Sequence, residues 1–179
     1  ALPILERGLR RPLRPGEAAL ELGAGDGSFA RRANEAGLEV HALDQTCPAP
    51  PGWPAQRTWH VADLRDFTHY ADYPVIVGNL VFHHLSDAEL RHWGAACRDH
   101  LRVILASEPS RRRGSALLFA ILGRLLRADP VTLHDARVSI AAGFVGHELP
   151  ELLGLGAGWD VRCHATALGA CRMVAVRTA

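Results

Sequence analysis

The chain has 179 residues and a formal net charge of +1, and 48% of its residues are hydrophobic while 22% are charged. This length and composition predict one globular domain over residues 1–179 with a sizeable core. A charge this close to neutral gives no reason to expect a nucleic acid partner. No stretch reaches the ~18 apolar residues that a membrane span needs. The first residues show no signal-peptide pattern, so a cytoplasmic location is expected.

The cysteines predict a reduced protein without a metal site. Cys47, Cys97, Cys163 and Cys171 form no C-x-x-C pair and show no metal-ligand spacing. Cys163 and Cys171 could face each other across a hairpin, but reduced thiols are the expected state in a cytoplasmic enzyme.

The first quarter of the sequence predicts a short amphipathic helix followed by a strand–turn–helix–strand unit. In chain order these elements are a helix over 2–13, a strand over 18–22, a helix over 27–36 and a strand over 38–43. The turn Gly23-Ala24-Gly25-Asp26-Gly27 lets the backbone approach a ligand closely. Asp44 lies 21 residues after Gly23, where a carboxylate at the end of the second strand can accept hydrogen bonds from both ribose hydroxyls.

The middle of the sequence predicts further strands of a parallel sheet. They cover residues 58–61, 74–78 and 103–106, after a proline-rich loop over 46–56. A helix separates the last two strands, and Ser86 and Glu89 form a capping box at its start. Ligands of open parallel sheets bind beyond the carboxyl ends of the strands. We therefore expect one rim to carry the residues at which the predicted strands end, namely Gly23, Asp44, Asp63, Asn79 and Glu108.

The last third of the sequence is predicted to close the domain with a hairpin. It comprises an apolar helix over 115–126, a turn or helix opened by Asp129-Pro130, a short helix over 148–155, and alternating strands over 159–164 and 172–176 joined around Gly169. His134, Asp135 and Arg137 fall in the turn or helix and are weaker candidates for a substrate pocket.

The glycine turn separates two classes of cofactor. A dinucleotide site has Gly-x-Gly-x-x-Gly, whereas Ser28 stands here in place of the third glycine. The carboxylates of Glu21 and Asp26 should repel a pyrophosphate and suit a ligand that carries an ammonium and a sulfonium group. The turn resembles motif I of the class I S-adenosylmethionine-dependent methyltransferases, Glu/Asp-x-Gly-x-Gly-x-Gly, matched by Glu21, Gly23, Gly25 and Gly27.

This resemblance implies a fold, a cofactor and a set of binding residues. The fold is an α/β, doubly wound, mostly parallel seven-stranded sheet with an antiparallel C-terminal hairpin. The cofactor is S-adenosylmethionine, with Asp44 on the ribose and Asp63 of Ala62-Asp63-Leu64 on the adenine amino group. The implied cofactor-binding residues are Glu21, Gly23, Ala24, Gly25, Asp44, Gln45, Ala62, Asp63, Leu64, Asn79 and Leu80.

The segment after the fourth strand indicates the kind of acceptor. Amino-group methyltransferases of this family carry two prolines there, whereas this chain has Asn79-Leu80-Val81-Phe82. The following His83-His84 resembles small-molecule methyltransferases of quinone and polyketide pathways, which implies transfer to a small aromatic or lipophilic acceptor, at oxygen. A phenol with a pKa near ~10 needs a base at pH 7. His83 and His84 are the catalytic candidates, and His83 is favoured because it is nearer the strand end.

Other functions stay open at this point. A non-catalytic S-adenosylmethionine-binding accessory protein, an RNA or protein methyltransferase, and a nicotinamide oxidoreductase all use related folds. Whether the chain forms a homodimer is also open.

Overall fold

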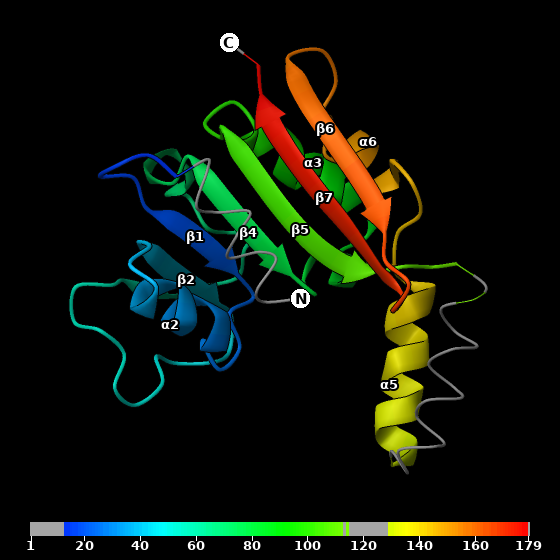
Figure 1. Cartoon of the computed structure of the whole chain (residues 1–179), viewed down its shortest axis with the longest axis horizontal. Helices are drawn as coiled ribbons and strands as arrows, with labels where there is room; N and C mark the ends of the chain where they lie inside the picture. The colour runs from blue at the N-terminus through cyan, green and yellow to red at the C-terminus, as the bar shows by residue number, and fades with distance from the viewer. Residues whose placement is uncertain (1–12, 113, 115–128, 179) are drawn as a thin grey trace.

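The computed structural model describes residues 13–112, 114 and 129–178. The helices predicted over 2–13 and 115–126 lie outside the described residues, apart from Leu13. The described chain forms one seven-stranded sheet in the order β3-β2-β1-β4-β5-β7-β6 (Figure 1). The strands are β1 (Ala19–Leu22), β2 (Val40–Asp44), β3 (Trp59–Val61), β4 (Val75–Asn79), β5 (Val103–Pro109), β6 (Trp159–Ala165) and β7 (Ala170–Arg177).

The pairing of these strands confirms the predicted fold class. Strands β1 to β5 pair in parallel, so their carboxyl ends meet at one edge of the sheet. β7 runs antiparallel to both β5 and β6 and is inserted between them. The result is a mostly parallel sheet whose C-terminal hairpin is antiparallel.

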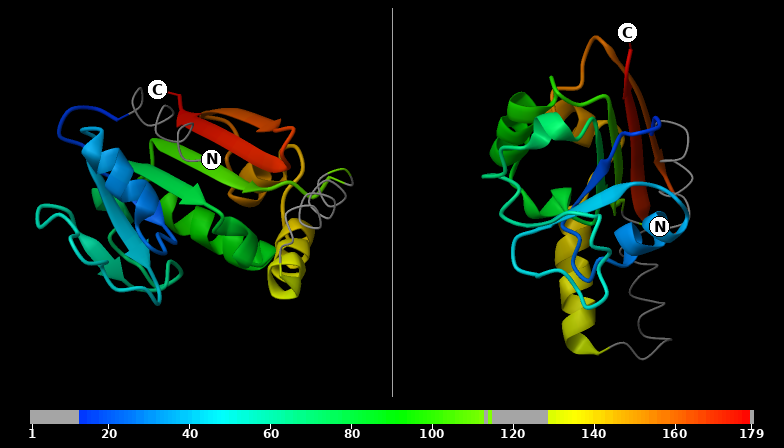
Figure 2. Two further views of the ribbon diagram at one scale, coloured as in Figure 1. Left: turned by 60° about the horizontal axis from the view of Figure 1, so that its bottom comes forward. Right: turned by 90° about the vertical axis from the view of Figure 1, so that its left-hand side faces the viewer.

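Helices cover both faces of the sheet. The α-helices of the described residues are α2 (Ser28–Glu35), α3 (Asp87–Cys97), α5 (Pro130–Ala141) and α6 (Glu148–Leu152). α3 and α6 lie on one face and α2 on the other, whereas α5 projects away from the sheet beyond the carboxyl end of β5 (Figures 1 and 2). The predicted capping box opens α3, because the Glu89 backbone N–H donates to Ser86 Oγ and the Ser86 N–H donates to the Glu89 carboxylate. Within the described residues, no helix is both long enough and apolar enough to span a bilayer.

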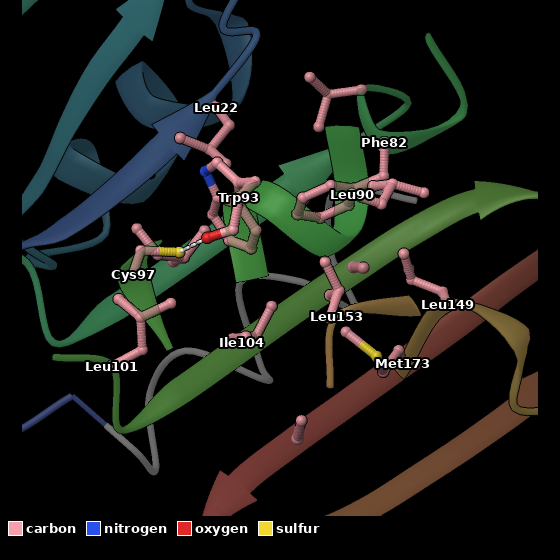
Figure 3. Close-up of a cluster of buried hydrophobic side chains, with 14 of the residues drawn as sticks. Leu22, Phe82, Leu90, Trp93, Cys97, Leu101, Ile104, Leu149, Leu153 and Met173 are labelled. Atoms are coloured by element: carbon pink, nitrogen blue, oxygen red, sulfur yellow. Dashed lines mark hydrogen bonds between the residues drawn. The ribbon is translucent and has the colours of Figure 1, made fainter. Parts of the chain in front are cut away.

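Alternation along the central strands builds two cores. Side chains of one parity, such as Leu20, Ile76 and Ile104, pack under α3 and α6, while the intervening residues pack under α2. The larger core gathers Phe82, Leu90, Trp93, Leu101, Leu149, Leu153 and Met173 (Figure 3). Cys97 belongs to this core, and its thiol lies 2.9 Å from the Trp93 carbonyl oxygen.

Several boundaries differ from the predictions because tertiary contacts set them. β5 continues to Pro109 since β7 pairs with it up to the Pro109–Ala170 register. Of the two alternatives predicted from Asp129-Pro130 onward, a turn or a helix, the structure has a helix, α5, whereas α6 is shorter than predicted. The loop over 46–56 is confirmed, and its Trp53 packs against the core that α2 covers.

Cys163 and Cys171 are not directly opposite one another. The hairpin register pairs Cys163 with Met173 and Cys171 with Ala165, so the two cysteines are diagonal neighbours on one face. Neither forms a disulfide, nor do Cys47 and Cys97, and the reduced state stays a prediction.

Gly94 is the contact point between α3 and the end of α6. A Cβ at this position would lie 2.4 Å from the Leu153 carbonyl oxygen, which is backbone and cannot rotate away. We expect Gly94→Ala to lower the free energy of unfolding by about 1–3 kcal/mol in urea titrations, despite the better helix propensity of alanine. Gly156→Ala is the control, since no atom of the described residues lies within 4 Å of its Cβ position. Equal stability of the two variants would contradict this description of the helix contact.

Candidate functional site

A pocket of about 360 Å³ opens at the carboxyl ends of β1 to β4. This is the edge at which the ligands of open parallel sheets bind. Its walls are formed by Gly23, Leu43, Asp44, Gln45, Thr46, Ala62, Asp63, Leu64, Arg65, Leu80, Val81, His84 and Leu85. Most of the residues predicted to bind the cofactor are therefore brought together, along with one of the two histidines.

The glycine turn lies against the segment that follows β4. Gly23 has φ +61°, and a Cβ there would lie 2.8 Å from Val81 Cγ2. Gly27 has φ +70°, and a Cβ would lie 2.8 Å from the Trp59 ring and 3.2 Å from the Trp53 ring. Both positions combine a left-handed backbone with no space for a side chain, so only glycine fits them without strain.

Asp44 ends β2 and holds the loop and the glycine turn together. Its Oδ2 accepts from the Gly25 N–H at 2.8 Å, and its Oδ1 accepts from the Thr46 and Cys47 N–H groups at 2.9 and 2.8 Å. Burial alone would raise the pKa of Asp44, but these hydrogen bonds outweigh burial and lower it. A carboxylate has about four lone-pair sites, so Oδ2 keeps one for a ligand. We therefore expect one direct ribose hydrogen bond instead of two.

Glu21 does not line the pocket, although it was predicted to bind the cofactor. It points to the α2 face of β1, is 3% exposed, and its Oε2 accepts from the Ala30 N–H at 3.1 Å. It thus satisfies one of the free N–H groups of the first turn of α2, where Gly27 provides no side-chain cap. Burial raises the pKa of Glu21 to about 8, and the charges of Asp26 and Asp44 add to this effect.

This raised pKa makes stability depend on pH. Between pH 4.5 and about 8 the folded state holds a proton that the unfolded state has released, so the free energy of unfolding falls as pH rises, by up to about 1.4 kcal/mol per pH unit. Glu21→Gln still accepts from Ala30 but does not titrate. Summed over this pH window, the slope predicts that the variant is more stable than wild type by up to about 5 kcal/mol at pH 8.5 and nearly equal at pH 4.5, as measured by urea unfolding. The control is Glu35→Gln on the exposed side of α2. If the free energies of unfolding of wild type and Glu21→Gln changed with pH in parallel, the raised pKa of Glu21 would be refuted.

Ala24, Gly25 and Asn79 also lie outside the pocket lining. The Ala24 N–H donates to the Leu43 carbonyl, and Gly25 contributes its N–H to Asp44. Asn79 ends β4, and its buried Oδ1 has no hydrogen-bond partner among the described residues. These three residues shape the rim, and their contact with a cofactor stays a prediction.

Leu80 is strained and exposed at the pocket wall. It has φ +60°, a conformation that non-glycine residues rarely adopt, and its side chain is more than half exposed. Its N–H donates to the Ser107 carbonyl of β5, which holds the chain in this conformation. Strained backbone of this kind clusters at binding sites.

Glu108 was expected on the ligand rim, and that expectation is wrong. It is fully buried within β5, where Oε1 accepts from the N–H groups of Val81 and Phe82 at 3.0 and 3.1 Å. Its Oε2 lies 2.7 Å from His83 Nδ1 and 3.3 Å from the His83 backbone nitrogen. The buried carboxylate of Glu108 therefore holds the backbone of the turn after β4 in place, and it does not line the pocket.

The two histidines occupy different environments, and this reverses the preference between them. His83 is 7% exposed, pairs with Glu108 and does not line the pocket. His84 does line it, with its ring 4.1 Å from that of His83. Burial lowers the pKa of His84, and the neighbouring His83 lowers it further. His84 is therefore neutral near pH 7 and can accept a proton.

Some pocket residues were not predicted from the sequence. Thr46, Arg65, Val81 and Leu85 line the pocket, yet only their nearness to predicted residues could have indicated them. His134, Asp135 and Arg137 lie on α5 and do not line this pocket. Among the described residues, no group of three His, Cys, Asp or Glu side chains is placed to hold a metal ion.

Comparison with known proteins supports the fold. No sequence model of a known family matches this chain, and no curated protein matches it. The plantazolicin methyltransferase BpumL, solved with S-adenosylhomocysteine (SAH), superposes with a TM-score of 0.76 at 10% identity over 98% of this chain and 81% of that one.

Two further structures share the fold. Magnesium protoporphyrin IX methyltransferase ChlM from Synechocystis PCC 6803, solved with SAH, gives a TM-score of 0.61 at 17% identity, over 99% of this chain and 82% of that one. A putative zinc-dependent alcohol dehydrogenase from Rhodobacter sphaeroides gives 0.61 at 13% identity, over 97% of this chain and 89% of that one. The chain thus has the Rossmann-like fold of these methyltransferases, and the residues of the site must indicate its function.

Proposed function

We propose that this protein binds S-adenosylmethionine and transfers its methyl group to a small molecule. The observation that carries the proposal is that Asp44 and Asp63 both line the pocket, at the carboxyl ends of the neighbouring strands β2 and β3. Carboxylates accept hydrogen bonds from ribose hydroxyls and an adenine amino group, and they favour a cationic ligand. The methyltransferases that share the fold were solved with SAH, which also supports this cofactor.

The geometry of the pocket fits this cofactor. Asp44 would bind the ribose through the free lone pair on Oδ2, and Asp63 and Leu64 would flank the adenine. The backbone of Gly23 would lie along the methionine part, since a side chain at this position has no space. A pyrophosphate would bind at the N-terminus of α2, but there the Ser28 N–H already donates to Asp26 Oδ1 at 3.0 Å and the Ala30 N–H to Glu21 Oε2 at 3.1 Å, so a dinucleotide fits the site less well.

We further propose that the acceptor is a phenol-like oxygen and that His84 is its base. S-adenosylmethionine supplies an electrophilic methyl group on its sulfonium centre. The protein contributes alignment and removal of the acceptor proton. His84 lines the pocket and is neutral near pH 7, whereas His83 is held by Glu108 below it. Leu80, Val81 and Leu85 supply apolar contacts beside His84 for an aromatic or lipophilic acceptor.

Methyl transfer from radiolabelled S-adenosylmethionine to a panel of phenols, quinols and carboxylic acids tests this function. We expect labelled ether products from at least one phenol or quinol. Cofactor binding without any turnover across the panel would favour a non-catalytic accessory protein, and labelling of RNA or protein instead would contradict a small-molecule acceptor.

A further inference from the structure

Arg65 joins the adenine side of the pocket to the start of α3. Its Nε donates to Asp63 Oδ1 at 2.8 Å and its Nη2 donates to Asp63 Oδ2, a bidentate pair. Its Nη1 donates to Glu89 Oε1 at 2.7 Å. Glu89 is itself fixed, because its Oε2 accepts from the Ser86 N–H at 2.7 Å in the capping box of α3. Arg65 is thus held in place by two carboxylates.

This network determines what Asp63 can still bind. Oδ1 already accepts from both Arg65 Nε and the Arg65 backbone N–H at 2.9 Å. Within the part of the chain that the structure describes, Oδ2 accepts only from Nη2, so one of its lone pairs is open. The hydrogen bonds and the charge of Arg65 lower the pKa of Asp63 despite partial burial. An ionised carboxylate only accepts, so this position favours a ligand group that donates, such as an exocyclic amine.

The energetic effect should fall on ligand binding more than on folding. The Arg65 side chain is half exposed, and exposed ion pairs contribute little stability unless they are bidentate or part of a network. The Arg65–Asp63 pair is bidentate and belongs to a network with Glu89. Its main effect is to orient the Asp63 side chain, since the planar guanidinium fixes the plane of the carboxylate. Loss of Arg65 would let the Asp63 carboxylate rotate and become solvated, which weakens a directional contact with a ligand.

We propose that Arg65 is a positioning residue that makes the pocket selective for the 6-amino group of adenine by orienting the Asp63 carboxylate. This inference rests on the proposed function, because it takes S-adenosylmethionine as the ligand. The chemical class that it selects is a purine nucleoside with an amino group at position 6, in preference to one without a donor there.

Isothermal titration calorimetry with two ligands tests the proposal. The ligands are SAH and its 6-deamino analogue, in which hydrogen replaces the amino group. We expect wild type to bind SAH at least about 10-fold more tightly than the analogue, the usual effect of a hydrogen bond to a charged group. Arg65→Ala should weaken SAH binding about 10-fold and change binding of the analogue less than about 2-fold, so that the preference disappears. The preference of Arg65→Lys for SAH should lie between those of wild type and Arg65→Ala, because lysine cannot pair with the carboxylate in a bidentate manner.

The matched control is Arg162→Ala. Arg162 pairs with Asp160 at the same two-residue spacing, at 2.9 Å, but on β6 and away from the pocket. This variant should bind both ligands as wild type does. Equal weakening of both ligands in Arg65→Ala, or no change in either, would overturn the inference while leaving the cofactor assignment intact. Failure of wild type to bind either ligand would overturn the proposed function itself.

Discussion

His84→Ala is expected to slow methyl transfer to a phenolic acceptor about 100-fold, the usual effect of removing a general base. His84 is the histidine that lines the pocket, while the imidazole of His83 is engaged by Glu108. The rate should be measured under saturating S-adenosylmethionine with the best phenol or quinol of the panel. Thermal unfolding should be nearly unchanged, because the His84 side chain is exposed.

The pH dependence separates a base from a merely structural residue. Because the pKa of His84 is lowered from 6.5, the wild-type rate should stay level down to about that pH and fall only below it, as the imidazole becomes protonated. His84→Ala should lose this acidic limb. His92→Ala serves as control, since His92 is exposed on α3 away from the pocket. A wild-type rate and an unchanged acidic limb in His84→Ala would assign the base to another residue.

Asp44→Ala is expected to weaken SAH binding by about 1–3 kcal/mol, which is roughly 10- to 100-fold. The variant removes the acceptor proposed for the ribose and also releases the N–H groups of Gly25, Thr46 and Cys47, which Asp44 now holds. The turn and the loop would then lose their common anchor.

Calorimetry measures this affinity, and urea unfolding confirms that the variant is folded before the comparison is made. Asp66→Ala is the matched control, because Asp66 is an exposed carboxylate that does not line the pocket. The affinity of Asp44→Asn for SAH should lie between those of wild type and Asp44→Ala, since the amide keeps one acceptor oxygen. An affinity for SAH in Asp44→Ala equal to that of wild type would remove the ribose assignment.

The sequence predicted the sheet well because local patterns specify it. The apolar strands, the glycine turn and the Ser86–Glu89 capping box depend on residues close together in the chain, and the structure confirms each of them. The strand ends also placed Asp44 and Asp63 correctly on the pocket wall. Their positions follow from the parallel order, in which every carboxyl end meets the same edge.

The side-chain directions could not be predicted in the same way. Glu108 seemed to follow a strand that ended at residue 106, but pairing with β7 extends β5 and turns this carboxylate into the protein. The position of Glu108 also decides between His83 and His84, which are neighbours in sequence, because His83 pairs with Glu108 and His84 lines the pocket. The direction of the Glu21 side chain could not be predicted either, because its position in β1 directs it to α2 rather than to the pocket.

Direct titration of the wild-type protein with SAH and, separately, with NADH tests the central claim most directly. The charge and shape of the pocket predict saturable 1:1 binding of SAH and no detectable binding of NADH at the same concentrations. Binding of NADH in the absence of SAH binding would mean that the acidic rim accommodates a diphosphate, and the assignment of the pocket would then be wrong.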